Sequence, residues 1–80
     1  MSGIEMIKVD SSNIRAIGYQ NGDLYVEYSS GTYKYIGVPK SLFEGLVGAS
    51  SKGKYMNEEI KGKYAYVKEF VIKVPAQKDS

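Results

Sequence analysis

The dipeptide Asn21-Gly22 restricts the fold of this chain more than any other feature of its sequence. Both residue types accept the positive φ angles of a two-residue turn, and Asn-Gly is the strongest short hairpin signal. The flanking residues alternate in polarity, which is typical of strands with one buried face. After the turn, Leu24, Val26 and Tyr28 share one face, with Tyr25 and Glu27 on the other; before it, Ile14, Ala16 and Gly18 alternate with Arg15, Ile17 and Tyr19. The sequence therefore predicts an antiparallel hairpin.

Two further strands are predicted beside this hairpin. Residues 5–9 form a short candidate strand before it. After it, the small residues Ser29-Ser30-Gly31 indicate a second turn, and residues 33–36 follow as a strand in which Tyr33 and Tyr35 lie on the same face. We therefore expect an antiparallel β-meander.

The periodicity changes to that of a helix after Pro39, a residue that suits a first helical turn. Residues 41–44, Ser-Leu-Phe-Glu, have the form of a capping box. The apolar positions at helical spacing are Leu42, Phe43, Leu46 and Val47. We predict a first short helix here.

A second helix is predicted over residues 55–63, after a loop of small residues from Gly48 to Gly53, and its buried side would carry Met56 and Ile60. Residues 64–74 return to an alternating pattern that Pro75 closes, so we predict a final strand. The expected fold class is α+β: a small antiparallel sheet packed against two short helices, with an added C-terminal strand. Residues 1–75 would form one domain and residues 76–80 a disordered tail.

The composition excludes several classes of function. The chain of 80 residues has no Cys and no His, so thiolate zinc sites, cysteine nucleophiles and the commonest general base are absent. No apolar stretch approaches the roughly 20 residues of a membrane span, and residues 1–9 are too polar for a signal peptide. We expect a cytoplasmic protein with no membrane partner, no enzyme activity, no metal and no cofactor.

Several short motifs in order resemble the KTSC domain family, which also occurs as short stand-alone bacterial and phage proteins. They are Ser11-Ser12-x-Ile14, Ile17-Gly18-Tyr19, Leu24-x-Val26, Gly31-x-Tyr33-x-Tyr35, Val38-Pro39 and Ala49-x-Ser51-x-Gly53-Lys54-Tyr55-x-Asn57-x-x-Ile60. The resemblance covers roughly residues 9–64 and implies a fold more than an activity. The family takes its name from the C-terminal domain of certain lysyl-tRNA synthetases, and the role suggested for it is RNA binding.

The first candidate site is the segment from Ser51 to Asn57, where a loop leads into a helix. Its proposed ligand-binding residues are Ser51, Lys52, Gly53, Lys54, Tyr55 and Asn57. Free backbone N–H groups, a favourable helix dipole and two Lys would suit a phosphate. In the alternative interpretation, Gly53 adopts a left-handed turn and the Lys side chains are merely solvated.

The second candidate is the pair Tyr33 and Tyr35, whose rings could form a platform on which bases stack, with Tyr25 extending it if the register allows. The alternative is that this face packs against the helices. Arg15, beside Ser11-Ser12, and Lys61 are further candidates for phosphate contacts. For Arg15 the alternative is a solvated outer face.

These residues lead to one functional hypothesis and two alternatives. We expect a non-catalytic module that binds a phosphate-bearing, base-containing ligand of nucleotide type, such as a phage protein that sequesters a nucleotide immune signal within a homo-oligomer. The first alternative is an RNA-binding domain. The second is a protein-interaction adaptor that uses the final strand as an exposed edge.

The small core predicts self-association. A chain of this length buries only roughly 60 to 65% of its unfolded surface, so an additional interface would stabilise it. The apolar residues Val67, Phe70, Ile72 and Val74 exceed what one small domain needs. We expect light scattering at high micromolar concentration to give a dimer or larger. A species with the monomer mass of 8.9 kDa would contradict this.

Overall fold

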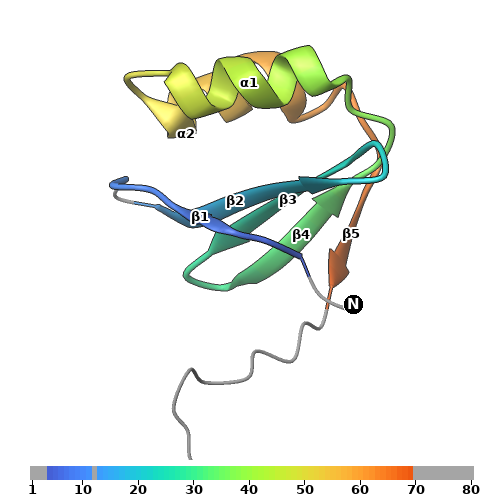
Figure 1. Cartoon of the computed structure of the whole chain (residues 1–80), viewed down its shortest axis with the longest axis horizontal. Helices are drawn as coiled ribbons and strands as arrows, with labels where there is room; N and C mark the ends of the chain where they lie inside the picture. The colour runs from blue at the N-terminus through green and yellow to red at the C-terminus, as the bar shows by residue number, and fades with distance from the viewer. Residues whose placement is uncertain (1–3, 12, 70–80) are drawn as a thin grey trace, which may run out of the picture.

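The protein has two layers, a five-stranded antiparallel sheet and a helical layer on one of its faces (Figure 1). This computed structural model describes residues 4–11 and 13–69. Because the sheet leaves a single face for the helices to cover, its strands alternate between core-facing and outward residues. The predicted α+β class is confirmed.

The strands are β1 (Ile7–Lys8), β2 (Ile14–Gln20), β3 (Asp23–Tyr28), β4 (Gly31–Tyr35) and β5 (Tyr66–Glu69). Their spatial order is β1-β2-β3-β4-β5, and each neighbouring pair is antiparallel. The first four strands form the predicted meander. After the helices, the chain returns to pair β5 with β4 at the sheet edge. The predicted strand over residues 64–74 begins two residues later than expected, at Tyr66. Its residues 70–74 and the predicted tail over residues 76–80 lie outside the described residues.

The turn between β2 and β3 has the predicted conformation. Asn21 and Gly22 have φ angles of 54° and 83°. Two consecutive positive φ angles match the right-handed twist of the flanking strands, which is why this dipeptide favours hairpins. The turn also supports the start of the helical layer, because the Gly22 carbonyl accepts a hydrogen bond from the Val38 amide at 2.9 Å.

The simple alternation predicted for β2 is wrong because the strand contains a β-bulge. Ile14 pairs with Tyr28 and Ala16 pairs with Glu27, so β2 has one residue more than β3 at this point. The extra residue shifts the alternation, so Ile17 and Tyr19 face the same side as Ile14. Both isoleucines are fully buried as a result.

Helix α1 (Lys40–Gly48) begins earlier than the capping-box prediction placed it. Its N-cap is Pro39, which makes no side-chain cap hydrogen bond. The Pro39 carbonyl instead accepts from the Leu42 amide at 3.0 Å and the Phe43 amide at 3.4 Å. A capping box needs its Ser at the N-cap, whereas Ser41 already lies inside the helix. Within the predicted apolar stripe, Leu46 is buried and Val47 is 41% exposed.

The second helical segment consists of α2 (Lys52–Tyr55), which continues directly as η1 (Met56–Ile60), a wide π-helical turn. It begins three residues before the predicted helix, because Ser51 acts as its N-cap. The Lys61 amide donates to the Met56 carbonyl at 2.8 Å, the five-residue spacing of a π turn. Met56 and Ile60 are fully buried, as predicted.

The core lies between the two layers. Its buried members are Ile14, Ile17, Leu24, Val26, Tyr35, Val38, Leu46, Met56 and Ile60. Tyr19 joins the layers: its ring stacks on Phe43 with centroids 5.3 Å apart, and its hydroxyl donates to the Val38 carbonyl at 2.5 Å. In the part of the chain that the structure describes, no helix is long and apolar enough to cross a membrane.

The contact between α1 and α2 should be sensitive to one methyl group at Gly45. A Cβ on Gly45 would collide with the hydroxyl of Tyr55 and lie 2.9 Å from its Cζ, whereas a Cβ on Gly48 would meet nothing within 4 Å. We expect Gly45→Ala to lower the free energy of unfolding by about 1 to 3 kcal/mol through overpacking. Gly48→Ala, in the same helix, should leave it unchanged or raise it. Denaturant unfolding measures both. Equal effects in the two variants would contradict the close packing.

Candidate functional site

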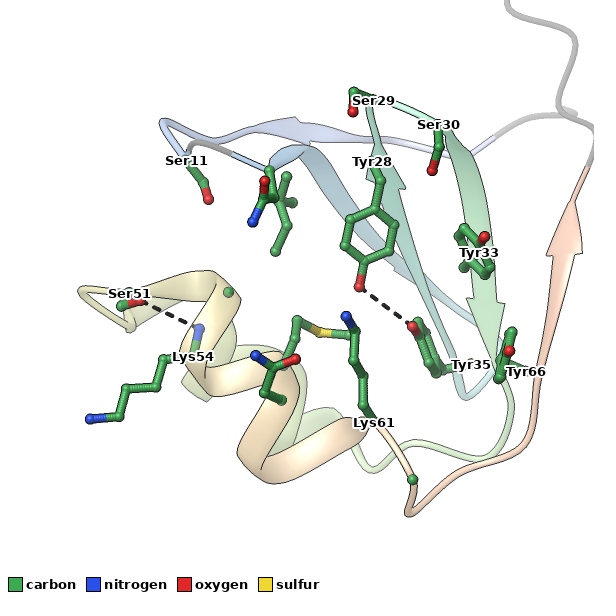
Figure 2. Close-up of a pocket in the computed structure, with 16 residues that line it drawn as sticks. Ser11, Tyr28, Ser29, Ser30, Tyr33, Tyr35, Ser51, Lys54, Lys61 and Tyr66 are labelled. Atoms are coloured by element: carbon green, nitrogen blue, oxygen red, sulfur yellow. Dashed lines mark hydrogen bonds between the residues drawn. The ribbon is translucent and has the colours of Figure 1, made fainter.

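A pocket of about 900 Å³ lies between the helix-facing side of the sheet and the α2–η1 segment (Figure 2). Strand residues form one wall, helix residues form the other, and the loops before β2 and β4 contribute further lining residues. The lining residues are Ser11, Asn13, Ile14, Tyr28, Ser29, Ser30, Tyr33, Tyr35, Ser51, Gly53, Lys54, Met56, Asn57, Lys61, Gly62 and Tyr66.

The strand wall is aromatic, and strand register brings its four tyrosines together. In the pairings of β4, Tyr33 lies opposite Val26, and Tyr35 lies between Leu24 and Tyr66. Directly paired residues share a face of the sheet, so these tyrosines face the helices with the core residues. Centroid distances are 5.5 Å for Tyr28–Tyr33, Tyr33–Tyr66 and Tyr35–Tyr66. The rings therefore form one continuous surface across three strands.

The hydroxyl groups of Tyr28 and Tyr35 are 3.4 Å apart and share a hydrogen bond (Figure 2). Burial raises the pKa of Tyr28 far above its ordinary value, and the hydrogen bond with Tyr35 raises it further. Burial also raises the pKa of Tyr35. Both hydroxyls are therefore neutral at physiological pH, and the wall carries no negative charge from them.

The helix wall is basic. The Lys61 ammonium lies over the Tyr28 ring, 5.3 Å from its centroid. Lys54 is an exposed residue at the Ser51 end of the pocket, and its side chain extends away from the tyrosine wall (Figure 2). None of the described residues that line the pocket is acidic. The charged groups among these lining residues are therefore all positive, and the ammonium of Lys61 lies against the aromatic wall.

Ser51 and Asn57 add polar groups to the helix wall. The Ser51 Oγ accepts a hydrogen bond from the Lys54 amide at 3.4 Å, so part of the backbone expected to bind phosphate is already occupied. The Ser51 hydroxyl proton is still available to a ligand. Gly53 lies inside α2 rather than in a left-handed turn, and a Cβ there would meet nothing within 4 Å. The left-handed conformation considered for Gly53 is therefore wrong.

Most of the residues singled out from the sequence meet in this pocket. They are Tyr33, Tyr35, Ser51, Gly53, Lys54, Asn57 and Lys61. The face of Tyr33 and Tyr35 is both core-facing and pocket-facing: Tyr35 is only 4% exposed, and Tyr33 is half-buried and packs against the core. The two interpretations of that face therefore describe two parts of one surface.

Three predicted residues do not line the pocket. Arg15 is exposed at the bulge of β2. The Lys52 ammonium donates to the Ala49 carbonyl at 2.7 Å, where it neutralises the end of α1. The Tyr55 ring lies against Gly45 between the helices. Lys52 and Tyr55 lie outside the pocket because their side chains point elsewhere, and the spacing of residues along a short helix does not reveal that direction.

Two pocket tyrosines were not among the predicted site residues. Tyr28 shares the face of Leu24 and Val26, a pattern that the sequence does reveal. Tyr66 reaches the pocket only because β5 pairs with β4 and Tyr66 lies opposite Tyr35. Tyr25, the residue expected to extend the platform, pairs with Lys34 on the other face. Among the described residues, no cluster of three or more His, Cys, Asp or Glu side chains could hold a metal ion.

The fold and this pocket define a small α+β domain with a tyrosine wall on its sheet and a lysine-bearing helical wall. A family model for the KTSC domain matches residues 10–64, and the chain belongs to the KTSC domain family. The crystal structure of a KTSC domain protein from Yersinia pestis is similar, with 35% sequence identity and a TM-score of 0.82, covering 85% of this chain and 100% of that chain.

Two curated relatives differ in how much of their length is matched. A lysine–tRNA ligase from Nostoc punctiforme is 38% identical over 64 residues, which are 76% of this chain but only 11% of the ligase. An uncharacterized protein from Stutzerimonas stutzeri is 34% identical over 61 residues, which are 72% of this chain and 86% of that protein. The chain therefore resembles a small part of the ligase and most of the second protein, and the ligase match does not show ligase activity.

The raised pKa of Tyr28 predicts a loss of stability at alkaline pH. A Tyr whose pKa is higher in the folded state stabilises the protein fully below about pH 10, and this contribution is lost as pH rises through the folded pKa. Between pH 8 and pH 11, the unfolding free energy of wild type should fall by about 1 kcal/mol more than that of Tyr28→Phe. This figure is already reduced for the partial exposure of the ring. Denaturant unfolding at both pH values measures this. The same loss in both proteins would contradict it.

Proposed function

We propose that this protein is a non-catalytic binding module and that its ligand carries a phosphate and a planar base. The ligand would lie in the pocket, with its base against the tyrosine wall and its phosphate toward Lys61 and Lys54. The supporting observation is the combination of a continuous aromatic surface with two lysines and no acidic residue among the described lining residues.

The energetics favour exchange of the Lys61 ammonium for a base on the Tyr28 ring. A cation over an exposed aromatic ring contributes only about 0.5 to 1 kcal/mol. A base on a tyrosine contributes about 1 to 3 kcal/mol, and a hydrogen bond between an ammonium and a phosphate about 1.5 to 3 kcal/mol. A ligand that offers both groups therefore replaces one weak contact with two stronger ones.

The lining chemistry also supports binding without catalysis. The described polar groups of the pocket are hydroxyls, amides and two ammonium groups. The chain has no His, and the raised pKa of Tyr28 and Tyr35 keeps their hydroxyls protonated, so neither acts as a general base near neutral pH.

RNA is the alternative ligand, and the similarity to a lysine–tRNA ligase favours it, since that protein's name places tRNA among its substrates. The two ligands differ in their response to salt. An RNA strand held by several phosphates loses affinity steeply as salt rises, with a logarithmic slope of about 0.7 for each phosphate contact. A mononucleotide held by one or two lysines would show a correspondingly shallow slope.

The experiment begins with a thermal-shift screen against mononucleotides, cyclic dinucleotides, ADP-ribose derivatives and short RNAs, because a ligand of the folded state raises the melting temperature. Calorimetric titration of the best ligand then compares Lys61→Ala and Lys54→Ala with wild type. Each variant should lose about 1.5 to 3 kcal/mol of binding free energy through the missing charge-assisted contact.

The matched control is Lys40→Ala, because Lys40 is an exposed lysine on α1 that does not line the pocket. It should bind the ligand as wild type does. If Lys61→Ala and Lys54→Ala both fold and bind the ligand with wild-type affinity, the ligand does not bind in this pocket. A screen in which no nucleotide or RNA raises the melting temperature would count against the ligand class itself.

A further inference from the structure

Strand β5 lies beyond the residues 10–64 that the family model matches, yet it contributes to the pocket. Tyr66 and Lys68 are two residues apart on this strand and pair with Tyr35 and Tyr33, so both share the helix-facing side of the sheet. The residue between them, Val67, faces the opposite side. Part of the aromatic wall therefore comes from a strand outside the family match.

Tyr66 extends the aromatic wall to the edge of the sheet. Its ring centroid is 5.5 Å from those of both Tyr33 and Tyr35, and the residue is 57% exposed, whereas Tyr35 is 4% exposed. Figure 2 shows Tyr66 on the side of the pocket opposite Ser51 and Lys54. The wall thus runs from a buried ring in the interior to an accessible ring at the edge strand.

Lys68 adds a third lysine to Lys54 and Lys61, and it lies at the β5 end of the aromatic wall. Its ammonium lies 6.0 Å from the centroid of the Tyr33 ring. The side chain passes close to Gly31, where a Cβ would lie 2.8 Å from the Lys68 Cε. Lys61 and Lys68 therefore each lie over a tyrosine ring, on Tyr28 and on Tyr33. The pairing of one cation with one aromatic surface occurs twice along the wall.

We infer that the ligand has at least two bases joined by a phosphodiester, and that β5 binds the second one. The inference rests on the proposed function of the pocket. The first base would lie at Tyr28 with its phosphate at Lys61, and the second would stack on the accessible ring of Tyr66 with Lys68 near its phosphate.

Two ligands share this chemistry, a free dinucleotide and a segment of single-stranded RNA. Stacking on a tyrosine tolerates any base, so neither source requires a particular sequence. The probes are therefore adenosine monophosphate, the dinucleotide pApA and an oligoadenylate of about eight nucleotides, within the usual range of single-strand site sizes. Equal affinity for pApA and the oligomer would identify a dinucleotide site, and tighter binding of the oligomer a site for a longer strand.

The readout is the ratio of pApA affinity to monophosphate affinity, measured by calorimetry on the full chain. In wild type, pApA should bind more tightly. Tyr66→Ala should weaken pApA binding by about 5- to 140-fold, the range expected for loss of one stacked base, and so reduce the ratio. Tyr66→Leu keeps apolar bulk without the aromatic face and should reduce the ratio as well. Lys68→Ala should lower it to a smaller extent.

Val67→Ala is the matched control, because Val67 lies on the same strand with 43% exposure but faces the other side of the sheet. It should keep both affinities at their wild-type values. A wild-type ratio near one, or a wild-type ratio in both Tyr66 variants, would overturn the role of β5. Monophosphate binding that depends on Lys61 would still support the proposed function in that case. If none of the three probes binds wild type, the role of β5 is overturned, whereas the proposed function fails only if the wider thermal-shift screen also returns no ligand.

Discussion

The pairing register of β3, β4 and β5 is the constraint on which the rest of the structure depends. Because paired residues share a face, the alignment of Val26 with Tyr33 and of Leu24 with Tyr35 and Tyr66 places small aliphatic residues and large rings side by side. The helical layer covers the aliphatic part and leaves part of the aromatic surface accessible. A shift by one residue would send the tyrosines to the other face and dismantle the core and the pocket together.

Tyr35 lies at the boundary between the core and the pocket. It belongs to the buried cluster and also lines the pocket, and its hydroxyl bonds with that of Tyr28. This bond keeps two polar groups satisfied at the edge of an apolar interior, where an unpaired hydroxyl would be costly. Rings in such a position are restrained by packing on one side, so this part of the pocket surface is ordered by the core itself.

Local signals in the sequence predicted much of this architecture, and tertiary contacts account for the differences. The Asn21-Gly22 turn, the meander and the burial of Met56 and Ile60 follow from φ preference and periodicity. The bulge in β2 has no marker in a single sequence, because the extra residue is recognised only against β3. Seven of the ten predicted site residues share the pocket. Lys52 and Tyr55 lie outside it because a short-range bond and interhelical packing set the directions of their side chains.

The π turn at Met56–Ile60 holds one residue more than an α-helical turn, and this extra residue sets the direction of the Lys61 side chain. Each residue of an α-helix advances the chain by about 100° around the axis, so a turn that holds one residue more displaces everything after it by a comparable angle. With the π turn in place, Ile60 is buried in the core and the next residue, Lys61, places its ammonium over the Tyr28 ring. A homologue with one residue fewer in this segment would form an ordinary α-helical turn and present a different side chain to the aromatic wall. Single-residue insertions and deletions here would therefore alter the helical wall of the pocket while the sheet stays unchanged.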